Sequence, residues 1–359
     1  SSAASDVYKR QEDAPSRAQR RVKNNTIIYS TVRPRLKHYG ILNNPQTNFI
    51  VSTGFVTIDL KEQYKQIIDP RYLYLLLTQS TITEYIGNIA DTAVSAYPSI
   101  NPADISSLSF NFPSFDLQKS VADIWENYDK KIVLNRQINQ NLEAMAKQLY
   151  DYWFVQFDFP NEEGKPYKSS GGEMVWNDKL KRNIPVGWHC GNLSEIAVFT
   201  NGLACQKFRP KADEVPLPVI KIREMHDGIS IDTEEVTSNI PESVKVYNGD
   251  VLFSWSASLE VMLWAYGLGG LNQHIFKVTS ANDFPKSFYY FQLLDYVDVF
   301  KKMAEARKTT MGHITQDHLQ QSTIAIPDNK DIADKFEKLI SPIFKQVVNC
   351  LLYTSDAAD

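Results

Sequence analysis

A run of apolar residues, spaced alternately by four and three positions, constrains the fold of this chain more than any other feature. It begins at Leu117 and reaches Tyr152, with Lys131 and Asn135 at two of its positions. Its predicted seam residues are Leu117, Val121, Ile124, Tyr128, Ile138, Leu142, Met145 and Leu149. A 3.5-residue period over about five heptads favours a coiled-coil helix, about 60 Å long at about 1.5 Å per residue. The alternative is an amphipathic helix that lies on a single core.

A second, shorter seam lies near the end of the chain. Its predicted residues are Ile332, Phe336, Leu339 and Ile343. Pro342 lies inside this seam and is expected to bend the helix or to end its first segment, because proline lacks a backbone donor. The natural partner of one heptad helix is its own duplicate, so we expect the two helices to pair.

The remainder of the chain indicates the same duplication. Residues 24–36 and 248–259 each begin with a turn signal and continue as a short apolar strand pattern. Three further blocks match in the same order: an aromatic and aliphatic helix, a polar loop leading to a strand that ends in proline, and the start of the heptad helix. Four matched blocks indicate an internal duplication. Strands and helices do not alternate regularly within a copy, so each globular part is predicted to be α+β.

Both ends of the chain are interpreted as adapter sequence, because one oligonucleotide read in opposite senses encodes Ser1–Gln11 and Cys350–Asp359. Between them we expect two globular domains and two helices. The expected segments are a truncated first domain over 12–115, a heptad helix over 116–160, a linker over 161–182, a second domain over 183–327 and a truncated helix over 328–349.

The distribution of charge favours contact with a polyanion. The net charge of −4 argues against a uniformly basic surface, yet residues 15–57 contain seven Lys and Arg residues and no acidic residue. A second basic cluster consists of Lys301, Lys302, Arg307 and Lys308. Such a cluster more often marks a solvated face than a ligand site, and finding one in each half of the chain shifts the balance toward polyanion contact.

No sequence motif points to catalysis or to membrane insertion. The chain has no Gly-x-x-x-x-Gly-Lys phosphate loop and no Asp- or Asn-Pro-Pro-aromatic motif, and Cys190 and Cys205 lack the spacing of zinc ligands. No apolar run is long enough to span a membrane, and the cysteine usage fits a reducing cytoplasm. The sequence therefore predicts a non-catalytic cytoplasmic protein without a metal or cofactor of its own.

Several stretches resemble the specificity (S) subunit of type I restriction–modification systems. NQNLEAMAKQLYDYWFVQFDF, residues 139–159, looks like the central conserved region of that family. LKRNIPVGWHCGNLSEI is similar to the opening of its second target-recognition domain, and IIYSTVRP and NGDVLFS resemble a strand that recurs in each recognition domain. The resemblance covers about residues 20–349.

This resemblance implies a DNA-reading scaffold in which each recognition domain reads one half of a split double-stranded DNA site. The two heptad helices would form an antiparallel coiled coil, set the gap between the half-sites and dock adenine methyltransferase subunits. Those partners would use S-adenosylmethionine, and a separate ATP-driven restriction subunit would cleave DNA.

The aromatic residues at the end of the long helix then have two alternative roles. Large, rigid aromatic side chains make good interface anchors, so they either hold a methyltransferase subunit or cap the coil against the core of the second domain. The residues concerned are Tyr150, Trp153, Phe154 and Phe157.

Basic and amide side chains near strand ends are the candidates for contact with DNA. Affinity comes mostly from phosphate neutralisation, and base edges are read by pairings such as Arg with guanine and Gln with adenine. The predicted DNA-binding residues are Arg33, Arg35, Lys37, His38, Gln206, Lys207, Arg209, Lys221, Arg223, Lys301, Lys302, Arg307, Lys308, Thr309 and His313. The acidic stretch 227–242 is expected to face away from DNA or toward a partner.

Two other functions compete with DNA reading. The first is a coiled-coil scaffold that binds only proteins, and the second is a nuclease that carries its own recognition domains. DNA binding that weakens steeply with salt separates the leading function from the scaffold, because phosphate contacts release counterions.

Overall fold

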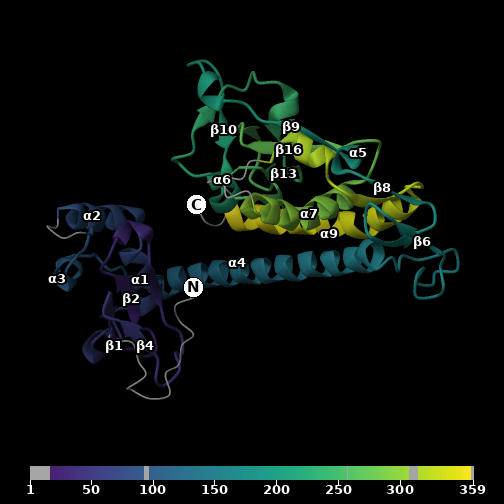
Figure 1. The fold of residues 1–359 in the computed structure, drawn as a ribbon. Coiled ribbons are helices and arrows are strands. Elements are labelled where there is room, and N and C mark those ends of the chain that lie inside the picture. Colours follow the sequence, from purple (N-terminus) through teal and green to yellow (C-terminus); the bar gives the residue numbers. More distant parts are fainter. Residues whose placement is uncertain (1–16, 93–96, 257, 307–313, 357–359) are drawn as a thin grey trace. The chain divides into compact units, whose positions relative to one another are not determined.

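Each half of the chain is built on one short strand with an antiparallel partner on both sides (Figure 1). In the first half, β2 (Ile27–Ser30) lies between β3 (Tyr39–Ile41) and β5 (Phe55–Ile58). In the second half, β13 (Val251–Ser254) lies between β14 (Glu260–Leu263) and β16 (Ile275–Ser280). β2 and β13 are the strands that the matched sequence blocks predicted, and their equivalent pairing confirms the duplication.

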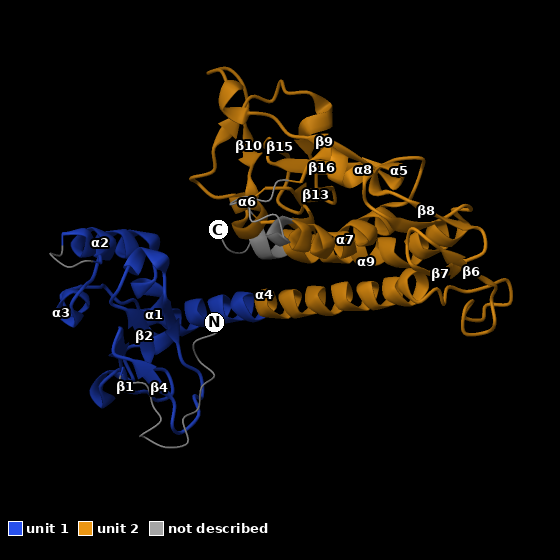
Figure 2. Cartoon of the chain, viewed as in Figure 1, with its two compact units in different colours: residues 1–130 blue, residues 131–359 orange. Residues whose placement is uncertain are grey.

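The structure, a computed structural model, describes residues 17–92, 97–256, 258–306 and 314–356, and the side chains of 304–306 and 353–356 are not among those described. The chain divides into two units, residues 1–130 and 131–359 (Figure 2). Each unit combines strands and helices, as the α+β prediction required.

Unit 1 holds its β2 sheet against two helices. Its core joins Ile27 and Tyr29 of β2 to Leu77 and Ile86 of the helices. The elements around this core are β1 (Ala18–Arg21), paired with β4 (Ile50–Ser52), the 3₁₀ turns η2 (Pro34–Leu36) and η3 (Glu62–Tyr64), and helices α1 (Pro70–Leu77), α2 (Ser80–Asp91) and α3 (Pro102–Ser106).

The first turns of the long helix α4 (Phe115–Tyr150) are fixed to unit 1 by polar contacts. The side chain of Gln118 is fully buried, accepts a 3.0 Å hydrogen bond from the backbone N–H of Asp69 and donates to the carbonyl of Ile67. Arg71 of α1 forms ion pairs with Asp123 and with another α4 carboxylate. The beginning of α4 is therefore part of the first unit's own structure.

Unit 2 places the sheet of β13 beside α7 (Lys286–Ala306), which packs along a second long helix, α9 (Asp331–Asp356) (Figure 1). β9 (Ala197–Asn201) extends the β13 sheet at the edge of β16. A second sheet has the order β11-β10-β15-β12, and β17 (Ile324–Pro327) pairs with β8 (Trp188–Gly191). The remaining elements are β10 (Leu217–Ile220), β11 (Glu235–Val236), β12 (Lys245–Val246), β15 (Gly269–Leu271), α5 (Leu193–Ile196), α6 (Ile222–Asp227), α8 (Gln316–Gln320), η5 (Cys205–Lys207) and η6 (Glu242–Val244).

The segment expected to be a linker, 161–182, is partly folded. β6 (Met174–Asn177) and β7 (Arg182–Pro185) form an antiparallel hairpin, and the side chain of Asn177 accepts from two backbone N–H groups of the turn. Tyr167 stacks on Phe159 with ring centroids 4.8 Å apart. An asparagine-capped turn and aromatic stacking give this polar stretch local structure, and its role as a linker stays a prediction.

In unit 2, α4 and α9 run antiparallel, and their buried faces differ from the predicted seams. The Asn139 side chain donates to the carbonyl of Val347, and further along α4 the ring of Tyr150 meets Phe336. Ala146 and Ile340 are also buried. Residues of α4, α7 and α9 contribute to one core. The buried faces of α4 and α9 therefore pack against α7 as well as against each other.

Several predicted seam residues are consequently exposed. Met145 of α4 is 60% exposed and Leu339 of α9 is 50% exposed. Within unit 1, Leu117, Val121, Ile124 and Tyr128 are also exposed. Ile138, Leu142, Leu149, Ile332 and Ile343 are half-buried. In unit 2, the heptad spacing predicted the helices but not which face is buried, because a third helix, α7, shares the core.

Two local features of these helices depart from a regular α-helix. α9 continues through Pro342, so the helix does not end there, and the alternative that Pro342 bends it stays a prediction. After Tyr150, α4 passes into a π-helical turn, η4 (Asp151–Val155), and Phe157 adopts a left-handed backbone with φ 66°. The wider turn brings Trp153 and Phe154 together into the core.

Candidate nucleic-acid interface

A hollow with a basic and apolar lining lies on unit 1, beside the end of β2. Its volume is about 800 Å³. It is lined by Arg17, Ser30, Val32, Arg33, Leu36, His38, Gly54, Phe55, Tyr97 and Ser99. None of these lining residues is acidic, so the hollow is suited to an anionic ligand.

The turn after β2 gives the hollow its shape. Arg33 adopts a left-handed backbone with φ 49°, and its N–H donates to the carbonyl of Pro98 at 2.9 Å. Pro34 starts the short turn η2, which Lys37 closes with a second left-handed backbone, φ 53°. Non-glycine residues rarely adopt this conformation, and such strain is concentrated at functional sites.

The turn places one guanidinium over an aromatic ring. The Arg33 guanidinium carbon lies 5.0 Å from the centroid of the Tyr97 ring, in a cation–π contact. The side chains of Val32, Leu36 and Tyr97 are 42%, 55% and 58% exposed. Exposed apolar groups beside fixed positive charge form a surface that matches the edge of a base and its neighbouring phosphates.

The other first-domain candidates divide between the hollow and its surroundings. His38 lines the hollow and is exposed, and Lys37 is exposed on the same turn. Arg35 instead turns toward α2, where it donates to Asn88 at 2.7 Å and pairs with Asp91 at 2.9 Å. A DNA-reading role for Arg35 does not fit these contacts, because α2 supplies an acidic partner that the local sequence does not reveal.

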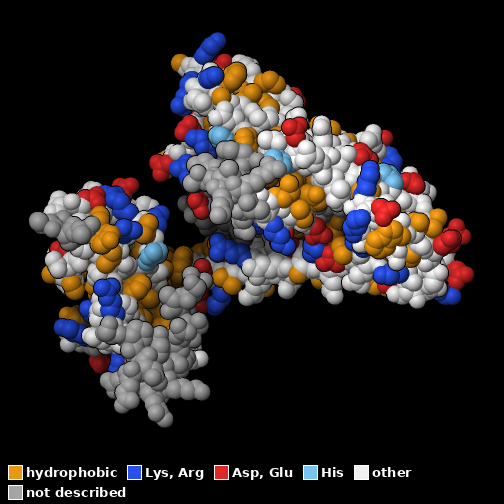
Figure 3. All heavy atoms as spheres, in the orientation of Figure 1, with side chains coloured by type: hydrophobic (Ala, Val, Ile, Leu, Met, Phe, Trp, Pro, Cys, Tyr) orange, Lys and Arg blue, Asp and Glu red, His pale blue; other side chains and the backbone are white. Residues whose placement is uncertain are grey.

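In unit 2, most of the candidate cations are paired with acids. Lys221 and Arg209 both approach Glu234, and the hydrogen bond from Lys221 lowers the pKa of that carboxyl. Arg223 pairs with Glu224 at 2.7 Å. Figure 3 shows the same intermixing, with blue and red side chains adjacent on the visible face of unit 2.

The acidic stretch 227–242 therefore does not simply face away from the candidate residues. It contributes Glu234 to Lys221, and the carbonyl of Asp232 accepts from Arg223. β11 brings this stretch beside β10, which the residue order along the chain did not indicate. Binding of phosphate by these cations would require the ion pairs to open.

The remaining second-domain candidates are exposed or fall outside the described residues. Gln206 and Lys207 are exposed on η5, and Lys302 is exposed on α7. Lys301 lies 3.7 Å from Asp298. Arg307, Lys308, Thr309 and His313 lie outside the described residues.

The aromatic residues proposed as subunit anchors are buried in the core of unit 2. Tyr150, Trp153, Phe154 and Phe157 are 2%, 5%, 3% and 0% exposed. They pack against Phe336 and against aromatic rings of α7 and β8. Of the two alternatives, core capping fits the structure, and the prediction that these side chains themselves anchor another subunit is corrected.

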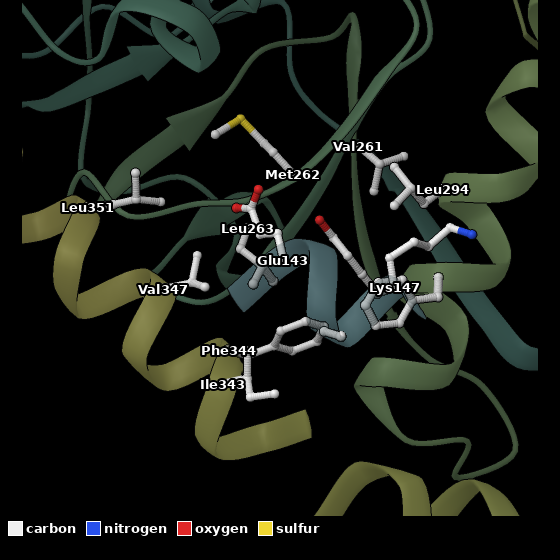
Figure 4. A pocket seen from close by; sticks show the side chains of 13 residues that line it. Glu143, Lys147, Val261, Met262, Leu263, Leu294, Ile343, Phe344, Val347 and Leu351 are labelled. Carbon is white, nitrogen blue, oxygen red and sulfur yellow. The ribbon is translucent and has the colours of Figure 1, made fainter. Parts of the chain in front are cut away.

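A second, smaller hollow lies among the long helices of unit 2. Figure 4 shows apolar side chains of β14, α7 and α9 around it, with Glu143 and Lys147 of α4. Its volume is about 370 Å³. Lys147 is paired with Asp295 at 2.9 Å. This mostly apolar lining is unsuited to DNA.

Among the described residues, no group of three or more His, Cys, Asp and Glu side chains is arranged to hold a metal ion. In the same parts of the chain, no helix is long and apolar enough to cross a membrane.

The comparison with known protein families identifies the chain. A family model described as the type I restriction modification DNA specificity domain matches residues 6–144 and 185–352. The chain belongs to this family. The two matched stretches fall one on each copy of the duplication, which explains why β2 and β13 have equivalent surroundings.

Relatives in this family are specificity subunits. The type I restriction enzyme HindI specificity subunit of Haemophilus influenzae is 40% identical over 147 residues, which are 41% of this chain and 31% of that protein. The chain therefore aligns with less than a third of the length of this relative. The type I restriction enzyme MjaIX specificity subunit of Methanocaldococcus jannaschii is 24% identical over 331 residues, which are 90% of this chain and 72% of that protein.

A solved structure shares the fold. The crystal structure of a type I restriction–modification S subunit from M. genitalium matches with a TM-score of 0.57 at 13% identity, over 95% of this chain and 81% of that one.

Of the residues that line the unit 1 hollow, only Arg33 and His38 were predicted from the sequence, and Arg17, Phe55 and Tyr97 are among those that were not. Arg17 could have been predicted, because it lies in the stretch of sequence without acidic residues. No sequence pattern indicated Phe55 or Tyr97. Phe55 approaches β2 through the pairing of β5, and Tyr97 through the bridge between Val32 and Ser99.

Proposed function

We propose that this specificity-domain protein is the DNA-reading subunit of a type I restriction–modification complex and that the unit 1 hollow is a contact surface for duplex DNA. The observation that carries the proposal is that none of the described residues lining that hollow is acidic, while Arg17, Arg33 and His38 surround exposed apolar side chains. Membership of the specificity-domain family supports it independently.

In this proposal each unit reads one half of a split DNA site. The equivalent sheets around β2 and β13 support two readers with one ancestry. The helices α4 and α9 would form the coiled coil that sets the gap between half-sites, an arrangement supported by their antiparallel contacts in unit 2.

Chemistry would come from partner subunits. S-adenosylmethionine would be bound by an adenine methyltransferase and ATP by a restriction subunit, both acting in the cytoplasm, while this chain supplies recognition without catalysis. This assignment of catalysis to partner subunits rests on the family of the chain and on the absence of methyltransferase and phosphate-loop motifs from its sequence.

Methyltransferase docking would use exposed residues of the paired helices, since the aromatic residues are buried. Met145 and Leu339 are the exposed apolar side chains at predicted seam positions of α4 and α9 in unit 2. Apolar side chains exposed on paired helices suit the packing of a further helix from a partner.

A binding titration tests the DNA-reading function. The full chain, alone and together with a type I adenine methyltransferase, is titrated with a pool of random-sequence duplexes at several salt concentrations. We expect log affinity to fall linearly with log salt, with a slope of about −0.9 for each phosphate contacted. Salt-independent or undetectable binding in both samples would favour the protein-only scaffold, and metal-dependent cleavage by the chain alone would favour the nuclease.

A further inference from the structure

Arg33 differs from the other candidate arginines in what surrounds it. Arg35, Arg209 and Arg223 each pair with a carboxylate. The Arg33 guanidinium instead lies over the face of the Tyr97 ring, and among the described residues it pairs with no carboxylate. A guanidinium on an aromatic face keeps its five N–H donors available at its edges, whereas one paired with a carboxylate has two of them occupied.

The backbone fixes where this guanidinium can go. Arg33 is held in a left-handed conformation by the hydrogen bond from its N–H to Pro98 and by the rigid Pro34 that follows. The bridge between Val32 and Ser99 joins the same turn to the segment that carries Tyr97. Both members of the cation–π pair are thus positioned by one short piece of backbone, which limits the entropy that binding must remove.

The surroundings of Arg33 suit a base edge better than a phosphate alone. Val32 and Leu36 are exposed beside it and offer apolar contact of the kind that a thymine methyl group accepts. Arg17 lines the same hollow and supplies positive charge for flanking phosphates, and the imidazole of His38 adds a hydrogen-bonding group. A planar cation between apolar groups, with a second cation nearby, is the arrangement expected at a base-reading position.

We propose that Arg33 reads a guanine from the major groove, donating two hydrogen bonds to O6 and N7 while Tyr97 holds its guanidinium flat. This inference rests on the proposed DNA-reading function and assigns a base to one residue of that surface. Only the major-groove edge of guanine presents these two acceptors side by side, and bidentate pairing with arginine matches their spacing.

The test is a selection from random-sequence duplexes with the full chain and three variants. Wild type should select a motif with a guanine at one position in one half-site. Arg33→Ala should lose the preference at that position while keeping the rest of the motif. Arg33→Lys should keep most of the affinity but discriminate less, because an ammonium group lacks the planar pair of donors. Arg35→Ala is the matched control and should select the wild-type motif.

A modified base then identifies the contact. Replacing the selected guanine with adenine should weaken wild-type binding by roughly 5- to 150-fold, the range for one bidentate pair. Replacing it with 7-deazaguanine, which lacks the N7 acceptor, should weaken wild type and leave Arg33→Ala unaffected. Thermal unfolding of each variant confirms that the fold is retained.

Two outcomes would overturn the inference, and they are distinguishable. If Arg33→Ala selects the full wild-type motif with uniformly weaker binding, Arg33 is a phosphate contact and the DNA-reading function stands. If wild type shows no salt-dependent binding to any duplex, the proposed function fails together with this inference.

Discussion

The buried side chain of Gln118 connects three segments of unit 1. Its side-chain oxygen accepts from the backbone of Asp69, and its amide donates to the carbonyls of Ile67 and Pro113. Buried polar groups stabilise a fold only while they remain paired, and removing one partner leaves the others unsatisfied. A single residue of α4 therefore determines how the helix leaves the sheet of unit 1.

We expect Gln118→Ala to destabilise unit 1 by about 2–4 kcal/mol, because it leaves a buried N–H and two carbonyls without partners. Hydrogen exchange of the α1 amides measures this locally. Lys119→Ala, at the exposed neighbouring position, should change stability by less than about 0.5 kcal/mol. If the α1 amides are equally protected from hydrogen exchange in the two variants, water molecules replace the hydrogen bonds of the glutamine side chain.

At the scale of single elements, the sequence predicted α4 and α9 but not the faces they bury. Heptad spacing indicates that one side of a helix is apolar. It does not indicate how many other helices share the core, which depends on the folded unit as a whole. α7 packs against α9, and Ala146 and Ile340 became the buried positions instead of Met145 and Leu339. The turn between β6 and β7 is closed by an asparagine, a residue type that favours turns, so this hairpin could have been predicted from the sequence.

The exposed seam residues give the docking proposal its test. Met145→Glu combined with Leu339→Glu should weaken association with a methyltransferase subunit at least about tenfold, because charges would replace apolar contacts at an interface. Co-purification and titration measure the effect. Gln148→Glu adds one charge at an exposed position of α4 and should leave assembly intact.

Unchanged assembly in the double variant, with a normal unfolding temperature, would remove these two positions from the interface. Trp153→Ala is a poorer probe, because truncating a buried aromatic side chain destabilises the core by about 3–5 kcal/mol whether or not a partner is present.

Across the whole molecule, the two units hold their candidate cations in different electrostatic settings. In unit 1, Arg17 lines a hollow whose described residues include no acid, whereas in unit 2 Lys221 is paired with Glu234. Composition averaged over the chain gives a net charge of −4 and conceals this contrast. Motif order along the chain was enough to predict the duplication, but contacts such as Arg35 with Asp91 depend on residues more than fifty positions apart.

Removing one positive charge should therefore have unequal effects in the two units. Arg17→Ala should reduce the salt slope of DNA binding by about 0.9, the loss of one phosphate contact, while Lys221→Ala should leave the slope unchanged. Titrations at a series of salt concentrations give both slopes. An equal reduction in the two variants would mean that the Lys221–Glu234 pair opens on DNA.

The left-handed turn that follows β2 has an evolutionary consequence. The hydrogen bonds of Arg33 and Lys37 to Pro98 and Pro34 are made by backbone atoms, so the path of the turn depends little on the side chains it displays. Asparagine and glycine adopt the same backbone with less strain. Substitutions in this turn can change the side chain that contacts a ligand while the neighbouring strands keep their structure. The turn is therefore a position where ligand specificity can change during evolution without a change of fold.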